Sequence, residues 1–348
     1  MNPMMSQSGA MQSQPRPLRP WAAKFKANPL WRLFVILTVP AFEFFWSWIL
    51  HFNEKIIYLK SPYIDADSKN LKRDAIEIYK NDPVFKEFAL WLKSRIPESV
   101  IQKKREEMNK RTDELAYAET LELQLDEETR LGILEFAMSA PVLNKVLPYF
   151  KIIPRIDTAF VLYNIPKPDL GGPEGSQRWH RDGDIYKMLS LYICLTDLDE
   201  NSGQYSAVSE RNLNYHQAIP LERVDGDKSI WKNGRHSDSY LRKFVPDSDL
   251  VHLKGPIGTA ALVDSASCYH KGGFCKERER ILFQINYICD QVHVRPSIVD
   301  YLSLRKNPKL SSLLLTPLQR AMVRSNAGRK GRLVFTLARR LLTYNIKP

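Results

Sequence analysis

The chain has 348 residues, of which 44% are hydrophobic, so it can build a sizeable core; intrinsic disorder, collagen and disulfide-stapled miniproteins are excluded. The formal net charge of +12 is concentrated at the two ends, because residues 301–348 carry eleven Lys or Arg and no acid, and residues 1–50 carry five against one Glu. The difference leaves residues 51–300 with a net charge of −3. This distribution argues against nucleic-acid binding by the body of the protein. It does not argue against nucleic-acid binding by a basic tail.

The cysteines do not form a pattern that binds a metal or builds a disulfide framework. They are spread along the second half of the chain, and no Cys-x-x-Cys pair occurs, so a structural zinc site is not expected. A reducing compartment follows, and we expect the protein in the cytoplasm. The four residues are Cys194, Cys268, Cys275 and Cys289.

The N-terminal segment divides into a polar tail and an apolar run. Residues 1–28 are predicted to be disordered, because the first twenty are rich in Ser, Gln, Pro and Met and show no periodic apolar face. Residues 29–55 are predicted as an apolar helix, whose centre at 30–50 approaches the roughly 20 residues that a bilayer span needs. Pro40 and Glu43 disfavour a span. Three interpretations stay open: a helix docked on the body, an interfacial or re-entrant membrane helix, and a true span.

Residues 56–150 are predicted to be a helical region that frames the rest of the protein. One run places Ala75, Ile76 and Ile78 on one side of a helix. Pro83 suits the first turn of the next helix, where a missing N–H costs nothing. A later helix carries the apolar residues Val142, Leu143, Val146, Leu147 and Phe150. No motif with chemistry occurs in this region.

Residues 151–295 are predicted to be a strand-rich core, which makes the fold mainly β with helical framing. Short β-type runs alternate with clusters of Gly, Pro, Asn and Asp, a spacing typical of an antiparallel sandwich or barrel. The runs are 158–163, 189–195, 204–208, 259–263 and 281–288. Neither GxGxxG after a strand nor GxxxxGK[ST] occurs, so nucleotide binding by those routes has no support.

Residues 296–348 are predicted to be a basic, helical C-terminal extension. An amphipathic pattern recurs at helical spacing between Leu333 and Leu342. One interpretation is a helix that caps the domain with a solvated basic face, and the other is contact with anionic lipid or an acidic partner. An anionic membrane surface is therefore a candidate partner, through residues 30–50 and 315–345.

Three residues could hold a metal ion: His180 and Asp182 in the string SQRWHRDGD, and His270 in CYHKGG. Side chains two positions apart in an extended segment share one face, so His-x-Asp offers two ligands side by side. A histidine from another strand completes a facial triad that leaves positions of Fe(II) open. A second pair, His236-x-Asp238, lies in a polar loop with no flanking strand, whereas predicted strands flank the first set.

Two arginines near the last predicted strand could bind an acidic ligand. Arg280 heads that strand, ten residues after His270, and a guanidinium there can bind a carboxylate through two hydrogen bonds. Arg278, two residues earlier, is the competing choice. The plainer interpretation of either arginine is a surface charge paired with Glu277 or Glu279.

In this order the motifs resemble the phytanoyl-CoA dioxygenase-like branch of the Fe(II)/2-oxoglutarate-dependent oxygenases. The resemblance covers about residues 140–290, and SQRWHRDGD, LSLYICLTDLDENSGQYSAVSE and GPIGTAALVDSASCYHKGG with its trailing Arg carry it. It implies a double-stranded β-helix, or jelly-roll, core. It also implies Fe(II) held by His180, Asp182 and His270, 2-oxoglutarate held through its distal carboxylate by Arg280, and O2 as the further cosubstrate.

The chain departs from the family pattern at two places. Where members often have Gly-Pro followed by Gly-Ser-His, this chain has Gly-Gln at 203–204 and Ser-Glu-Arg at 209–211. Gly272 stands where a hydroxyl residue often helps to hold 2-oxoglutarate. Gln177 and Trp179, just upstream of the first histidine, are candidates for the wall of the cosubstrate or substrate site, with packing as the alternative for the tryptophan.

The resemblance implies hydroxylation of a small molecule, a lipid or a glycan precursor, with release of succinate and CO2. A carboxylate ligand at Asp182 favours hydroxylation over halogenation. The main alternative is a non-catalytic jelly-roll protein that binds a ligand or a membrane surface, because a fold alone does not imply activity. The string His180-Arg181-Asp182 also matches the start of a protein-kinase catalytic loop. That loop needs Asn five residues after the Asp, where this chain has Lys187, so a kinase is rejected. The expected location is cytoplasmic, with peripheral membrane association through the two ends.

Overall fold

The computed structural model describes residues 52–63, 71, 74–113, 116–168, 173, 175–182, 187–209, 219, 235–289 and 297–323. All of them belong to one unit, Leu50–Gly328. The predictions for the polar tail, for residues 30–50 and for the amphipathic pattern after residue 323 lie outside the described residues. Within the described ranges, no helix combines the length and the apolar character that crossing a membrane requires.

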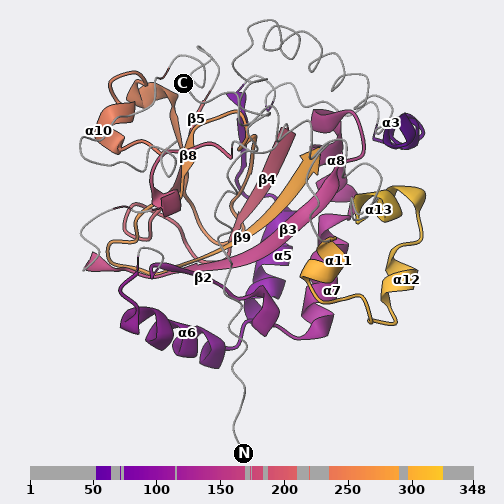
Figure 1. Cartoon of the computed structure of the whole chain (residues 1–348), viewed down its shortest axis with the longest axis horizontal. Coiled ribbons are helices and arrows are strands. Elements are labelled where there is room, and N and C mark those ends of the chain that lie inside the picture. Colours follow the sequence, from indigo (N-terminus) through magenta and orange to yellow (C-terminus); the bar gives the residue numbers. More distant parts are fainter. Residues whose placement is uncertain are drawn as a thin grey trace, which may run out of the picture. The chain divides into compact units, whose positions relative to one another are not determined.

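The larger of two sheets is antiparallel throughout and has six strands within the described residues. From edge to edge they are β1 (Ile76–Tyr79), β7 (Ala260–Val263), β4 (Lys187–Cys194), β9 (Arg280–Cys289), β3 (Arg155–Asn164) and β2 (Ala118–Thr120). The long strands β3, β9 and β4 lie side by side at its centre (Figure 1). The predicted alternation of β9 is confirmed, because its apolar set is buried in the core on one face. That set is Ile281, Phe283, Ile285 and Tyr287.

The smaller sheet is also antiparallel and lies against one face of the larger sheet. Its strands are, in order, β6 (Leu250–Leu253), β5 (Tyr205–Val208) and β8 (His270–Lys271). Isolated bridges extend it, because His180 pairs with His270 and Trp179 pairs with His236. Side chains from both sheets share one apolar cluster, which includes Tyr192 of β4 and Tyr205 of β5.

The order in which the chain visits the two sheets defines the fold. From β3 onward it passes through the segment at 179–180, then β4, β5, β6, β7, β8 and β9. The larger sheet thus contributes the four-strand order β3-β9-β4-β7, and the smaller one contributes the 179–180 segment, β8, β5 and β6. Two facing four-stranded antiparallel sheets with this connectivity form a double-stranded β-helix, as the sequence predicts.

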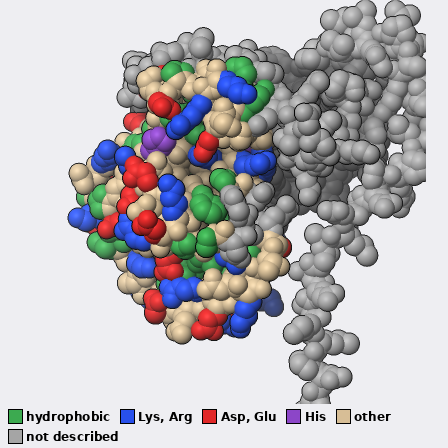
Figure 2. Space-filling view, turned by 90° about the vertical axis from the view of Figure 1, so that its left-hand side faces the viewer, with side chains coloured by type: hydrophobic (Ala, Val, Ile, Leu, Met, Phe, Trp, Pro, Cys, Tyr) green, Lys and Arg blue, Asp and Glu red, His purple; other side chains and the backbone are tan. Residues whose placement is uncertain are grey.

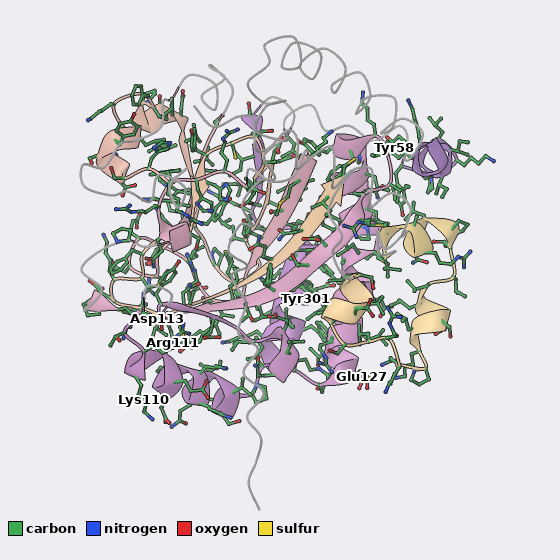
Figure 3. The ribbon with its side chains drawn as sticks, viewed as in Figure 1. Tyr58, Lys110, Arg111, Asp113, Glu127 and Tyr301 are labelled. Carbon is green, nitrogen blue, oxygen red and sulfur yellow. The ribbon has the colours of Figure 1, made fainter. Side chains whose placement is uncertain are left out.

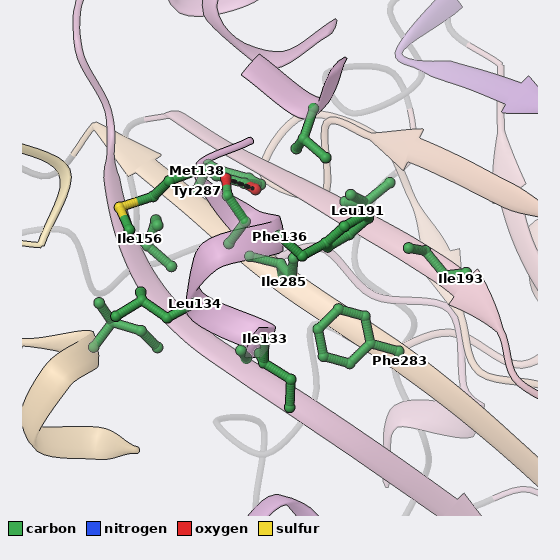
Figure 4. Packing of buried hydrophobic residues seen from close by; sticks show 14 of the residues in the cluster. Ile133, Leu134, Phe136, Met138, Ile156, Leu191, Ile193, Phe283, Ile285 and Tyr287 are labelled. Atoms are coloured by element: carbon green, nitrogen blue, oxygen red, sulfur yellow. Dashed lines mark hydrogen bonds between the residues drawn. The ribbon is translucent and has the colours of Figure 1, made fainter. Parts of the chain in front are cut away.

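Helices cover the outer face of the larger sheet. The principal ones are α5 (Pro83–Ser94), α7 (Glu127–Ala137) and α8 (Ala140–Phe150). Figure 4 shows Ile133, Leu134 and Phe136 of α7 packed against apolar residues of β4 and β9. The predicted start of α5 is confirmed, since Asp82 caps it through the Val84 N–H and Pro83 occupies its first turn. The five apolar residues predicted on one side of α8 are all buried.

Further helices and turns surround this framework. They are α3 (Phe52–Leu59), α6 (Glu98–Lys110), α10 (Asp238–Leu241), α11 (Ile298–Tyr301), α12 (Leu310–Leu313) and α13 (Pro317–Met322), with 3-10 turns η1 (Glu122–Gln124), η3 (Gly175–Gln177) and η5 (Asp247–Asp249). Tyr301 of α11, labelled in Figure 3, packs against β3. Its hydroxyl donates a hydrogen bond to Glu122 at 2.7 Å. Arg111 and Asp113 form an ion pair just after α6, also visible in Figure 3.

The helix predicted through Ala75, Ile76 and Ile78 is wrong. These residues enter the edge strand β1, and Ile76 lies opposite Val263. Ala75 has a φ of 58°, which breaks a helix at that point. Ile76 and Ile78 both contact the cluster between the sheets, which is the period of two of a strand. The short strands β2, β6 and β8 are also absent from the predicted runs.

Acidic and basic side chains are interspersed on the face drawn in Figure 2. No patch of a single sign gathers on the described residues there. This mixture agrees with the small net charge that the sequence assigns to the body of the chain.

Candidate metal centre

His180 and His270 are held in register by their own backbones. The N–H of His180 donates to the carbonyl of His270 at 2.9 Å, and the N–H of His270 donates to that of His180 at 2.8 Å. The N–H of Asp182 donates to the carbonyl of Ser265 at 2.9 Å, which fixes the third residue beside them. Because side chains alternate along extended chain, His180, Asp182 and His270 meet on one face.

The three side chains are close enough to share one ion. Nε2 of His180 is 4.0 Å from Oδ1 of Asp182, and Nε2 of His270 is 3.7 Å from Oδ2 of the same carboxylate. Two donor atoms bound about 2.1 Å from one metal lie no more than about 4.2 Å apart. The site is open on one side, since the side chain of Asp182 is 32% exposed whereas both histidines are buried.

The hydrogen bonds of the two rings leave the correct nitrogens for a metal. Nδ1 of His180 lies 2.8 Å from the carbonyl oxygen of Arg178, and Nδ1 of His270 lies 3.3 Å from that of Cys268. A proton on each Nδ1 leaves the lone pair of each Nε2 directed toward Asp182. Burial lowers the pKa of His180 to about 2, and the charges of His270 and Arg235 act in the same direction. Burial also lowers the pKa of His270, against the opposing effect of Asp182.

Neutral imidazoles are the form that binds metal, so this donor set fits a divalent ion. Two nitrogens and one carboxylate on one side, with the other side open, is the arrangement expected for non-haem Fe(II). Of the residues that the structure describes, these three form the one group of His, Cys, Asp or Glu side chains with such a spacing.

Arg280 and Arg278, which the sequence leaves as alternatives, occupy different environments. Arg280 is 4% exposed, and its guanidinium donates to Oδ1 of Asn164 at 2.9 and 3.2 Å and to the carbonyl of Gly203. Arg278 lies at the surface and pairs with Asp199. Among the described residues, no carboxylate pairs with Arg280, so its charge is available to a ligand.

Glycines lie around the guanidinium of Arg280. A Cβ at Gly272 would lie 3.4 Å from Nη2 of Arg280, so the absence of a side chain leaves room there. Gly203 has a φ of +73°, and a Cβ on it would lie 2.7 Å from the carbonyl oxygen of Gly273. Gly203 thus belongs to a tight turn that directs its carbonyl to Arg280.

The two candidates for the site wall lie in different layers. Gln177 is buried in η3. Trp179 is also buried, but its ring packs in the outer cluster with Leu241 and Tyr269, and its Nε1 donates to Asp238 at 2.6 Å. Trp179 therefore packs behind the metal-binding segment and does not line the space between the sheets.

His236, which the sequence places in a polar loop without a flanking strand, is fully buried. Its side chain is 0% exposed, and its backbone exchanges two hydrogen bonds with Trp179. Its ring meets that of Tyr269 edge to face, with centroids 5.2 Å apart. His236 thus belongs to the layer behind His180 and His270 and lies outside the group that they form with Asp182.

Sequence reasoning missed Arg235, Tyr192 and Tyr205. The ring of Tyr205 stacks on that of His270 at 5.8 Å, and the rings of Tyr192 and Tyr205 are 4.3 Å apart. Arg235 lies close enough to both histidines to lower the pKa of each. No local pattern marks these residues, because strand pairing brings them to the site from distant parts of the chain.

No protein-family model matches this sequence, and comparison with curated proteins gives no match. Several solved structures are similar in architecture. EctD from S. alaskensis with 2-oxoglutarate and 5-hydroxyectoine is 12% identical, over 66% of this chain and 81% of that one, with a TM-score of 0.44. The epimerase SnoN in complex with Fe3+, alpha ketoglutarate and nogalamycin RO is 13% identical, over 69% and 89%, with a TM-score of 0.40.

EvdO2 from Micromonospora carbonacea var. aurantiaca, complexed with 2-oxoglutarate, is 10% identical, over 65% of this chain and 91% of that one, with a TM-score of 0.40. With TM-scores below 0.5 and identities of 10–13%, these likenesses do not establish the chemistry of this chain. Its function is therefore inferred from its own residues.

Proposed function

We propose that the chain is an Fe(II)- and 2-oxoglutarate-dependent oxygenase. The observation that carries the proposal is the ligand group itself: His180, Asp182 and His270 meet between the sheets of a jelly-roll, and both imidazoles direct Nε2 toward the carboxylate. The proposed catalytic core is residues 151–295, framed by residues 56–150.

His180, Asp182 and His270 would hold the iron. Bound iron with 2-oxoglutarate and O2 would supply oxidative decarboxylation, which yields succinate and CO2 and transfers one oxygen atom to a substrate C–H bond. The carboxylate of Asp182 would hold the iron where a halogenating enzyme would bind a halide, so hydroxylation is the favoured outcome. The backbone pairing of the two histidines fixes their rings before the metal binds, and the carbonyls of Arg178 and Cys268 fix their tautomers.

Arg280 would bind the distal carboxylate of 2-oxoglutarate. A planar guanidinium suits a carboxylate better than an ammonium group does, and burial strengthens the attraction because water screens it little. Gly272 supports this role, since a side chain there would occupy space beside the guanidinium. Gln177, buried on the same segment as His180, is proposed to line the cosubstrate site.

The proposed substrate is a small molecule, and lipid and glycan precursors belong to that class. Membership of the phytanoyl-CoA dioxygenase-like branch is part of the same proposal, as is a cytoplasmic location with peripheral attachment to an anionic membrane. The partly exposed carboxylate of Asp182 supports access of a substrate from solvent to the metal.

Succinate formation tests the proposed activity. Purified protein with Fe(II), ascorbate, 2-oxoglutarate and air should release succinate slowly even without substrate, and His270→Ala should release none. A non-catalytic binding protein would give no succinate with either chain, and that result would refute the proposal. Screening cell extracts for products heavier by one oxygen atom would then identify the substrate.

A further inference from the structure

Arg235 lies next to His180 on the inner face of the smaller sheet. Trp179 and His236 exchange backbone hydrogen bonds of 3.0 and 2.7 Å, which defines an antiparallel pair. In an antiparallel ladder the next residues along, His180 and Arg235, face each other, with Cβ atoms roughly 4.5–5.5 Å apart. His270 lies opposite His180 on the other side. The row across the sheet is therefore Arg235, His180, His270.

The guanidinium of Arg235 has no partner among the described residues. Its Nη1 is buried and forms no hydrogen bond, and no described carboxylate pairs with it. A buried donor without a partner is costly, because it has lost its hydrogen bonds to water.

The charges of the site call for a further anion. Bound Fe(II) with the carboxylate of Asp182 retains one positive charge, and Arg235 and Arg280 add two more. Dianionic 2-oxoglutarate compensates two of these three charges. Among these described residues one positive charge then remains. Arg235 stands beside His180, whereas Arg280 lies beside Gly272, two residues beyond His270 in the chain.

We infer that Arg235 binds an acidic group of the substrate, a carboxylate or a phosphate, and so holds the substrate beside the metal centre. This inference rests on the proposed function for the identity of the site. It narrows the substrate to an anionic small molecule. The C1 carboxylate of 2-oxoglutarate is an oxyanion of the same kind. The experiment below distinguishes an Arg235 that binds the substrate from an Arg235 that binds this carboxylate.

The first measurement is binding of inorganic phosphate to the metal-free protein at constant ionic strength, followed by 31P NMR line broadening. Arg235→Gln should weaken phosphate binding at least tenfold, and Arg235→Lys should restore part of it because the charge returns. Arg242→Gln is the matched control: Arg242 lies on the same segment, but it is exposed and pairs with Asp247. Circular dichroism and Tm of each variant verify folding.

The second measurement is the affinity of the anaerobic Fe(II) protein for 2-oxoglutarate. Arg235→Gln should change it less than twofold, while Arg280→Gln should weaken it at least tenfold. Unchanged phosphate binding in Arg235→Gln would overturn the inference, and so would a tenfold loss of 2-oxoglutarate affinity, which would assign Arg235 to the cosubstrate. Failure of the proposed function itself has a different signature, namely wild-type protein that binds phosphate but not 2-oxoglutarate.

Discussion

Trp179, the residue before His180, donates its indole N–H to the carboxylate of Asp238 at 2.6 Å. Lys271, the residue after His270, forms an ion pair with the same oxygen, and its ammonium lies 5.0 Å from the centre of the Trp179 ring. One carboxylate on the outer face of the sheet thus joins the neighbours of both metal-binding histidines. Asp238 belongs to the second His-x-Asp pair of the sequence, and it serves as a support behind the ligands.

Asp238→Ala should therefore weaken metal binding without removing a ligand. We expect a loss of about tenfold in Co(II) affinity, the lower end of what outer-shell substitutions cost. Isothermal titration calorimetry measures this affinity, and Asp247→Ala, an exposed acid on the same segment, is the control. Equal Co(II) affinity in Asp238→Ala and wild type would show that the support is unnecessary.

His270→Ala should abolish binding of one equivalent of Co(II), because it removes one of three ligands. The control is His252→Ala, since that half-buried ring hydrogen-bonds to Ser206 outside the ligand group. His236→Ala should retain the metal but lower the free energy of unfolding, because the ring is fully buried behind the site. If His236→Ala loses the metal and His270→Ala keeps it, the ligand assignment is incorrect.

Arg280→Ala should raise the KM for 2-oxoglutarate in succinate release by roughly 10- to 100-fold, as expected for loss of hydrogen bonds to a charged group. Arg278→Ala should leave this KM within about twofold, because its exposed pair with Asp199 is a surface salt bridge. Steady-state kinetics on both variants make the comparison. The reverse order of effects would transfer the carboxylate-binding role to Arg278.

The metal-free protein should become less stable as the pH falls below about 6.5, the usual pKa of histidine in an unfolded chain. Burial lowers the pKa of His180 in the folded protein to about 2. Below pH 6.5 the unfolded chain therefore takes up a proton on this histidine that the folded protein does not take up. Urea unfolding between about pH 6.5 and 4.5 should give a steeper loss of stability for wild type than for His180→Gln. The slopes should differ by up to roughly 1.4 kcal/mol per pH unit. Parallel curves would contradict this environment for His180.

Local patterns in the sequence predict much of the fold, and the structure brings the three proposed ligands His180, Asp182 and His270 together. The alternation in β9 and the cap at Asp82 are set by neighbouring residues, and the spacing of His180 and Asp182 is local too. The prediction of a helix at Ile76 fails because the four-residue edge strand β1 is stabilised by its pairing with β7, and no local pattern in the sequence reveals that pairing.

Long-range pairing determines what the sequence could not resolve. Arg278 and Arg280 are two residues apart and would share a face of one extended strand, but β9 begins only at Arg280, so the alternation does not extend back to residue 278. The place of Arg235 beside His180 depends on the bridge between Trp179 and His236. No pattern within a single segment reveals that bridge.

The most direct test of the proposed oxygenase is the visible spectrum of the anaerobic protein with Fe(II) and 2-oxoglutarate. Chelation of 2-oxoglutarate by protein-bound Fe(II) should produce a weak charge-transfer band in the wild type. His180→Ala should lack the band, and Arg242→Gln should retain it at wild-type intensity. Absence of the band in folded wild-type protein, or an equal band in His180→Ala, would contradict the assignment of His180, Asp182 and His270 as the iron site.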